Sequence, residues 1–168
     1  MSFEQSTKFD DKSRIGLLHE MERHFDSRDI EYFKQLLHHE DNVIRTRTVC
    51  ILAEIGGRRV VNAIGDTLTN DKDALVRHEA AFALGQLGFT EALITLSHSI
   101  NSDPSLFVRH EAAIAVGVIG SEQGRDSLKK ALFDESQEVR ESAKIALANL
   151  DYISSIERKG KFAKLTGG

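Results

Sequence analysis

Two residue types that restrict or cross-link a polypeptide are almost missing from this chain of 168 residues. Proline occurs once, as Pro104, and cysteine occurs once, as Cys50. A single cysteine excludes an internal disulfide and a cysteine-rich zinc site, and the scarcity of proline favours helices throughout. Cys50 lies in an apolar stretch, Thr-Val-Cys-Ile-Leu-Ala, which favours a small buried residue over a nucleophile.

Several classes of function are disfavoured by further absences. No run of 18 apolar residues is present, so we expect no membrane span, and the N-terminal residues lack the hydrophobic core of a signal peptide. These two features predict a cytoplasmic protein. The net charge of −4 gives no basic footprint for nucleic acid, and no glycine-rich phosphate loop follows a strand. The length and the 40% of apolar residues suit one soluble domain.

The chain does contain a repeated sequence motif. Residues 75–88 and 107–120 share the core Val-Arg-His-Glu-Ala-Ala, displaced by 32 residues. A period in this range indicates an array of helical repeats. Related helices are marked by four arginines at intervals of 32, 32 and 31 residues: Arg45, Arg77, Arg109 and Arg140. Each follows an acidic or amide turn suited to cap a helix, and we expect the arginines to bridge to turn carboxylates of neighbouring hairpins.

The spacing of apolar residues predicts an all-α protein, an α-solenoid of about five helical hairpins. Hairpins of this kind cannot bury their apolar faces alone, so stacking supplies the core. Helices are expected at 13–26, after Asp29, after each acidic turn, and over 58–69, 90–100 and 122–133. Three of the repeat helices are expected to stop at glycine: Gly56, Gly88 and Gly120. We therefore divide the chain into a flexible N-terminus (1–12), a repeat domain (13–150) and a basic C-terminal tail (151–168).

The pattern Asp-x-x-x-Val-Arg-x-x-Ala-x-x-Ala-Leu-Gly-x-Leu-Gly resembles the short HEAT-like repeat, the subclass named after phycobilin lyases, over residues 41–150. A sharper resemblance is to deoxyhypusine hydroxylase, whose repeats carry His-Glu pairs. That family has two arms, each with two such pairs, which together enclose a di-iron centre. Here Val76 to Ala81 and Val108 to Ala113 match one arm, and the corresponding positions Thr46-Arg47 and Glu141-Ser142 do not supply a second.

The two His-Glu pairs are the candidate metal ligands: His78, Glu79, His110 and Glu111. On a helical wheel His78 lies opposite the apolar core, and we expect Gly85, seven residues on, to leave open space beyond the ring. Two histidines and a carboxylate with open positions form the ligand set of non-heme iron oxygenases. The sequence therefore favours a metal-dependent, presumed iron-dependent, monooxygenase in which these four residues hold the metal; it assigns no catalytic residue and no organic cofactor.

A homodimer would supply the missing arm, with two copies giving four histidines and four glutamates for a di-iron site. The alternative is a non-catalytic HEAT-repeat scaffold or chaperone that holds a protein or a chromophore-bearing partner on its concave face. Either reading predicts a protein substrate or partner on that face. A third His-Glu cluster, His38-His39-Glu40-Asp41, sits at a helix end, where histidine interacts favourably with the helix dipole.

Overall fold

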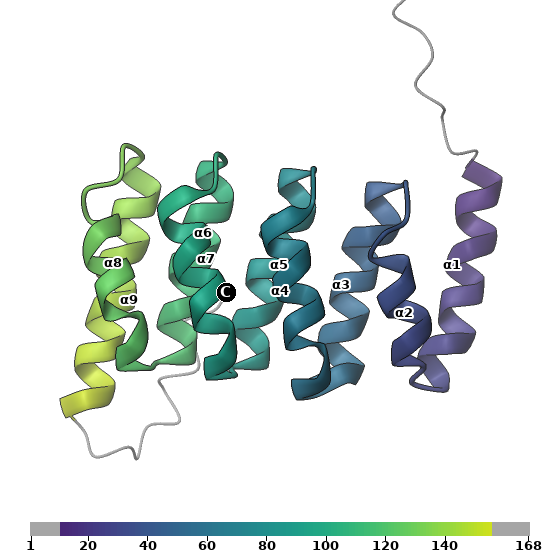
Figure 1. The fold of residues 1–168 in the computed structure, drawn as a ribbon, viewed down its shortest axis with the longest axis horizontal. Coiled ribbons are helices and arrows are strands. Elements are labelled where there is room, and N and C mark those ends of the chain that lie inside the picture. The colour runs from purple at the N-terminus through teal and green to yellow at the C-terminus, as the bar shows by residue number, and fades with distance from the viewer. Residues whose placement is uncertain (1–10, 156–168) are drawn as a thin grey trace, which may run out of the picture.

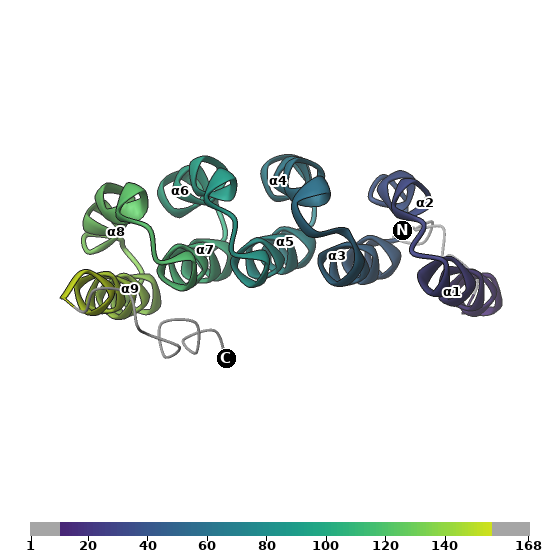
Figure 2. The same ribbon diagram turned by 90° about the horizontal axis from the view of Figure 1, so that it is seen from below.

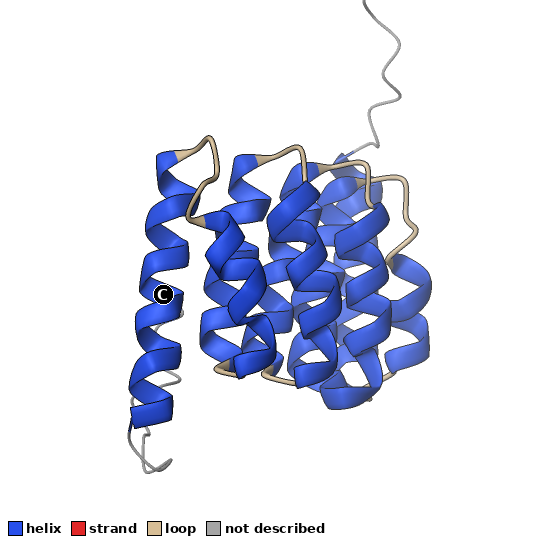
Figure 3. Cartoon of the chain, turned by 60° about the vertical axis from the view of Figure 1, so that its left-hand side comes forward, coloured by secondary structure: helices blue, strands red, loops and turns tan. Residues whose placement is uncertain are grey.

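In the computed structural model, which describes residues 11–155, helices stack side by side in two layers (Figure 1). All regular structure in these residues is helical (Figure 3). The predicted all-α solenoid of helical hairpins is therefore confirmed. In chain order the α-helices are α1 (Asp11–Asp26), α2 (Ile30–Leu36), α3 (Asn42–Gly56), α4 (Val61–Asn70), α5 (Ala74–Leu87), α6 (Leu93–Ser102), α7 (Leu106–Ile119), α8 (Arg125–Ala131) and α9 (Gln137–Ser155).

Odd-numbered and even-numbered helices form separate layers (Figure 2). We call α1, α3, α5, α7 and α9 the inner layer, because this row bends around the concave side in Figure 2, and the four others the outer layer. Helices α1 to α8 pair into hairpins, and α9 continues the inner layer. Short 3-10 helices precede α4, α6 and α8, so these three begin later than predicted. No helix within residues 11–155 is long and apolar enough to cross a membrane.

The boundaries differ from the prediction at both ends. Helix α1 begins at Asp11, two residues before the predicted start at 13, and α9 continues to Ser155 beyond the predicted boundary at 150. The rest of the predicted flexible N-terminus and of the basic tail, including Arg158, Lys159, Lys161 and Lys164, lies outside the described residues.

The core lies between the two layers and repeats with the period of the sequence. One of the inner-layer positions that are fully buried in every repeat carries a β-branched residue in all four: Ile44, Val76, Val108 and Val139. Fully buried outer-layer residues belong to the same cluster: Ile64, Leu96 and Leu128. Each hairpin thus contributes one apolar face to a core that runs along the whole stack, as expected for a solenoid.

Glycines end three of the inner helices, with one correction to the prediction. Gly88 and Gly120 adopt the left-handed conformation, with φ of 72° and 70°. At the end of α3 the positive φ of 56° belongs to Gly57 and not to Gly56, which is the last helical residue. The Cβ of a larger residue would disfavour this backbone conformation, which is why glycine is common at helix ends.

An ion pair between successive hairpins recurs along one edge of the stack. Arg45, Arg77 and Arg109 each use Nε and Nη2 to bind both carboxylate oxygens of an aspartate in the next turn, namely Asp71, Asp103 and Asp134. The Nε–Oδ2 distances are 2.6, 2.8 and 2.8 Å. These contacts confirm the predicted bridging role of Arg45, Arg77 and Arg109, and we call them the Arg–Asp ladder. Arg140 differs from the prediction, because its Nη1 donates to the backbone carbonyls of Asp134 and Glu135.

The ladder also includes the first hairpin. Arg14 of α1 donates from Nε to Oδ2 of Asp41 at 2.7 Å. Asp41 also accepts from the backbone N–H of Val43 and so caps α3. Arg14 and Asp41 thus form an ion pair of the same kind as Arg45 and Asp71, and it ties α1 to the turn before α3.

Inner helices approach one another closely at two glycines. A Cβ placed on Gly85 would lie 2.9 Å from Cα of Ala115, and one on Gly117 would lie 2.8 Å from Cβ of Ala146. Real Cβ atoms do not come this close, so only glycine fits at these contacts. The prediction that Gly85 leaves open space beside His78 is therefore wrong. Gly85 lies where α5 contacts α7, and a residue with a side chain would not fit there. This contact sets the spacing of the two helices that carry the His-Glu pairs.

Candidate metal centre

The four predicted ligands lie on the inner layer, in the first half of α5 and of α7. The structure brings His78 and Glu111 together: Nε2 of the ring lies 3.5 Å from Oε2 of the carboxylate. The His78 side chain is 33% exposed and that of Glu111 is 11% exposed. The histidine of the first pair, on α5, therefore lies beside the carboxylate of the second pair, on α7. These two helices also touch at Gly85 and Ala115.

The two remaining predicted ligands bind other residues. Glu79 of α5 accepts a hydrogen bond from the Cys50 thiol of α3, with Sγ 3.0 Å from Oε1. His110 of α7 lies with Nδ1 2.6 Å from the Ser142 hydroxyl of α9. Within residues 11–155 no group of three or more His, Cys, Asp or Glu side chains is placed to hold one metal ion. The four residues form a row across the inner helices, and only His78 and Glu111 already meet.

The Ser142 contact orients the His110 ring. Oγ of Ser142 lies 2.6 Å from Nδ1 of the ring and 2.8 Å from the backbone carbonyl oxygen of Glu138. In the tautomer in which Nδ1–H donates to the hydroxyl, Nε2 carries the lone pair that would bind a metal.

Burial and neighbouring charges shift the ionisation of the row. Burial lowers the pKa of His78; Glu79 acts against this shift and His110 adds to it. Burial and the nearby Glu79 carboxylate raise the pKa of Glu111. These effects link His78 electrostatically to Glu79 and His110, and Glu111 to Glu79. A lowered pKa keeps His78 uncharged at neutral pH, which is the form that ligates metals.

Cys50 and Ser142 are the residues that sequence reasoning missed. Burial and the hydrogen bond to Glu79 raise the pKa of Cys50 to about 12, so the group is a thiol that donates and not a thiolate. The raised pKa disfavours a nucleophilic thiolate, but Cys50 is only partly buried, whereas the sequence favoured a buried residue. Ser142 follows Arg140 by two residues, as Glu111 follows Arg109, so repeat alignment could have indicated that it lies beside the preceding histidine.

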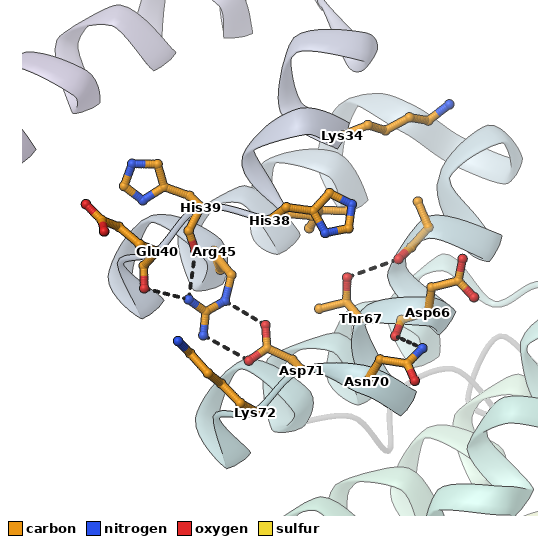
Figure 4. Close-up of a pocket in the computed structure, with 12 residues that line it drawn as sticks. Lys34, His38, His39, Glu40, Arg45, Asp66, Thr67, Asn70, Asp71 and Lys72 are labelled. Atoms are coloured by element: carbon orange, nitrogen blue, oxygen red, sulfur yellow. Dashed lines mark hydrogen bonds and ion pairs between the residues drawn. The ribbon is translucent and has the colours of Figure 1, made fainter.

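The third cluster in the sequence does not assemble into a ligand set. His38 and His39 follow α2 and point in different directions (Figure 4). Nδ1 of His39 accepts from the backbone N–H of Asp41, whose carboxylate caps α3. His38 and His39 border a polar cleft of about 520 Å³, which is also lined by the ladder pair of Arg45 and Asp71. The cluster therefore belongs to the framework that joins two hairpins.

Comparison with known proteins assigns the class of the fold. The sequence matches the description of HEAT repeats at residues 30–117 and 61–148, so the chain belongs to the HEAT-repeat family. Among solved structures it is similar to human deoxyhypusine hydroxylase in complex with glycerol, with a TM-score of 0.70 and 26% sequence identity. That similarity covers 80% of this chain and 49% of the human protein, so this chain spans about half of its length. No curated protein matches the sequence.

Proposed function

We propose that this protein is an iron-dependent hydroxylase of the deoxyhypusine hydroxylase type, in which His78, Glu79, His110 and Glu111 hold the metal. The similarity to the human enzyme and the HEAT-repeat fold support the class. One observation carries the metal site: Nε2 of His78 and Oε2 of Glu111, which come from different helices, lie 3.5 Å apart. Donor atoms from two helices that already lie this close could both bind one ion after small movements of their side chains.

The remaining donors fit the same ion type. Imidazole and carboxylate are the ligands of non-heme iron, and such an ion with open positions would supply the activation of dioxygen for hydroxylation. The Ser142 hydroxyl, 2.6 Å from Nδ1, orients the His110 ring and leaves Nε2 as the nitrogen that would bind the metal. Glu79 is held by the Cys50 thiol, which occupies one oxygen and leaves the other for a further contact. The chain thus fixes the direction of each side chain before a metal arrives.

The number of ligands in one copy is half of what the proposal needs for two ions. Two copies would bring together four histidines and four glutamates, enough for a di-iron site shared across a homodimer. A protein substrate would then enter along the concave face.

Metal content after anaerobic loading with Fe(II) tests this function. We expect the wild type to retain iron through desalting and the double variant His78→Ala with His110→Ala to lose it, with at least about a 100-fold weaker affinity. Ser142→Ala should weaken binding about 10-fold, because residues that orient a ligand typically contribute this much. A matched control replaces His19 and His98, which are exposed on other helices, by alanine. Equal iron in wild type and the His78, His110 variant would contradict the proposal.

A scaffold without catalysis is the second candidate, and one observation favours it. Each of the four proposed ligands already contacts a protein group: His78 and Glu111 each other, Glu79 the Cys50 thiol, and His110 the Ser142 hydroxyl. A scaffold would bind the same partner, with the same affinity, through the wild type and through the variant that lacks both histidines, in the presence of a metal chelator. Loss of that binding in the variant would exclude this candidate.

A further inference from the structure

An open cleft lies between α1 and α3, the first two helices of the inner layer. Its volume is about 650 Å³, which is within the range of sites that bind ligands. Its apolar lining comes from both helices: Leu18, Met21 and Phe25 of α1, and Val43 and Ile51 of α3. Phe25 is 38% exposed and Val43 is 47% exposed. The structure thus gathers these side chains around one hollow, which we call the α1–α3 cleft.

The register of the helices explains why the cleft is open. The close α5–α7 contact pairs Gly85, eight residues after the ladder arginine of α5, with Ala115, six residues after that of α7. The same counts on α1 and α3 reach Glu22 and Ile51. These larger side chains prevent the same approach, and α1 packs less closely against α3 than α5 does against α7.

Charged side chains stand at the mouth of the cleft. Glu22 and Asp26 line it from α1, one helical turn apart, and Arg47 lines it from α3. All three are exposed, and within residues 11–155 none of them forms an ion pair or a side-chain hydrogen bond. An occupant that complements the cleft therefore has apolar side chains for the floor and positive charges for the two carboxylates of α1.

We propose that the α1–α3 cleft binds residues 156–168 of a second copy of this chain. This segment contains four arginine and lysine residues and one acidic residue. Its apolar residues Phe162 and Leu165 lie three positions apart, the spacing of anchors in segments that dock in a groove between helices. Lys161 precedes the first anchor and Lys164 precedes the second. The anchors suit the apolar floor, and the two lysines suit the two carboxylates at the mouth.

The other segment outside the described residues complements the cleft less well. Residues 1–10 contain two phenylalanines, Phe3 and Phe9, but one lysine against two acidic residues. Their excess of negative charge has the same sign as the two carboxylates of α1, so these residues would be repelled where residues 156–168 are attracted.

The reach of the chain favours a second copy over the same copy. Phe162 lies seven residues beyond Ser155, where α9 ends, and an extended chain of this length covers at most about 25 Å. Three helix spacings, or about 24–30 Å, separate α9 from α3, the nearer wall of the cleft (Figure 2). Only a fully straight segment would bring even the first anchor to this wall. Because cleft and segment belong to opposite ends of the stack, each contact leaves one of each free, and copies can join into open chains.

Sedimentation velocity of the purified full chain over a range of protein concentrations, with a metal chelator present, tests the inference. We expect the mean mass of the wild type to rise above the 18.7 kDa of one chain, and to fall again at high salt. A cleft variant, Phe25→Ser with Val43→Ser, and a tail variant, Phe162→Ser with Leu165→Ser, should each need at least about a tenfold higher concentration. Ile15→Ser is the matched control, because Ile15 is 53% exposed on α1 but does not line the cleft.

Mixing the two variants tests the contact itself. The tail variant keeps an intact cleft and the cleft variant keeps an intact tail, so an equimolar mixture should form a complex of one copy of each at concentrations where the wild type associates. A mixture that stays monomeric, a wild type that stays at the mass of one chain, or equal association of the wild type and either variant would overturn the inference.

A charge variant keeps the test valid if the cleft variant proves misfolded by circular dichroism. Glu22→Lys with Asp26→Lys replaces only exposed residues, and it should weaken association as strongly as the tail variant does. Association of this variant equal to that of the wild type would also overturn the inference. Because every sample contains the chelator, neither result depends on the metal site proposed above.

Discussion

The inner and outer layers of the stack are built from the same chain and the same period, yet they differ in how their helices meet. Inner helices touch through glycine and alanine, so that α5 and α7 approach at Gly85 and Ala115. In the outer layer the corresponding contact is looser, since a Cβ on Gly65 would lie 3.4 Å from the Thr95 hydroxyl. Close inner spacing is what allows a histidine on one helix to face a carboxylate on the next.

The two layers also differ in what they expose. The inner layer carries the His-Glu pairs, whereas the polar cleft in Figure 4 is bordered by the ladder pair of Arg45 and Asp71 and by outer-layer side chains such as Lys34 and Asp66. The candidate site therefore lies on the inner layer alone, while the ladder joins inner helices to the turns between the two layers. Substitutions that act on one layer only are the way to test it.

The largest expected loss of stability comes from breaking the Arg–Asp ladder, which joins successive hairpins. Arg77→Ala would leave the Asp103 carboxylate, 6% exposed, without its bidentate partner. Removing one member of a buried pair costs about 3–5 kcal/mol in the free energy of unfolding. Arg14→Ala, at the more exposed first rung with its side chain 29% exposed, should cost about 1.5–3 kcal/mol. Urea unfolding of both variants measures the difference, and equal losses would show that burial does not grade the rungs.

A smaller effect distinguishes the two layers directly. Gly117→Ala would force a methyl group against Ala146 and should destabilise the protein by about 1–3 kcal/mol. Gly65→Ala in outer helix α4 meets only an ordinary contact and gains helix propensity, so we expect a stabilisation of up to about 1 kcal/mol. Thermal and urea unfolding of this pair would show opposite signs. The same sign for both variants would refute the difference in packing between the layers.

The smallest effect is the acid sensitivity of the last rung. Burial acts to raise the pKa of Asp134, but the hydrogen bonds from Arg109 and from the backbone N–H of Ser136 outweigh it and the pKa is lowered below the ordinary 3.8. The folded protein therefore binds fewer protons at this group than the unfolded chain does. Its contribution to stability is present above about pH 4 and is lost as the pH falls through the lowered pKa.

Unfolding by urea between pH 7 and pH 2.5 measures this loss. Asp134→Asn should be less stable than wild type at pH 7, and its stability should fall less steeply below pH 4, because the variant has no carboxylate to protonate. A variant curve parallel to that of the wild type would mean that Asp134 does not contribute to acid unfolding.

Much of the fold could be predicted because its signals are local and repeated. The ladder arginines and the glycines at the ends of α5 and α7 recur at fixed positions of the repeat. The structure shows the arginines bound to turn carboxylates and the glycines at the helix ends, as expected. The first rung was not predicted, since Arg14 lacks the surrounding repeat word and is recognised only by its contact with Asp41. Gly85 was misjudged because the helical wheel of one helix cannot reveal how close the next helix comes.

That His78, Glu79, His110 and Glu111 hold a metal stays a prediction, and the sequence did not indicate how these four side chains would pair. Each histidine reaches to the following helix, His78 to Glu111 and His110 to Ser142. A sequence of repeats specifies which side chain occupies a position, but the stagger between adjacent helices decides which unlike positions meet.

The sequence by itself determined that this chain forms stacked hairpins, since a hairpin with one apolar face has no other way to bury it. It also placed two His-Glu pairs at equivalent positions of consecutive inner helices. Only the tertiary structure decided that two of these groups lie 3.5 Å apart and that the other two are held by a thiol and a hydroxyl. The physical reason is that such distances depend on helix spacing, which is set by the contact of Gly85 with Ala115, 30 residues further along the chain.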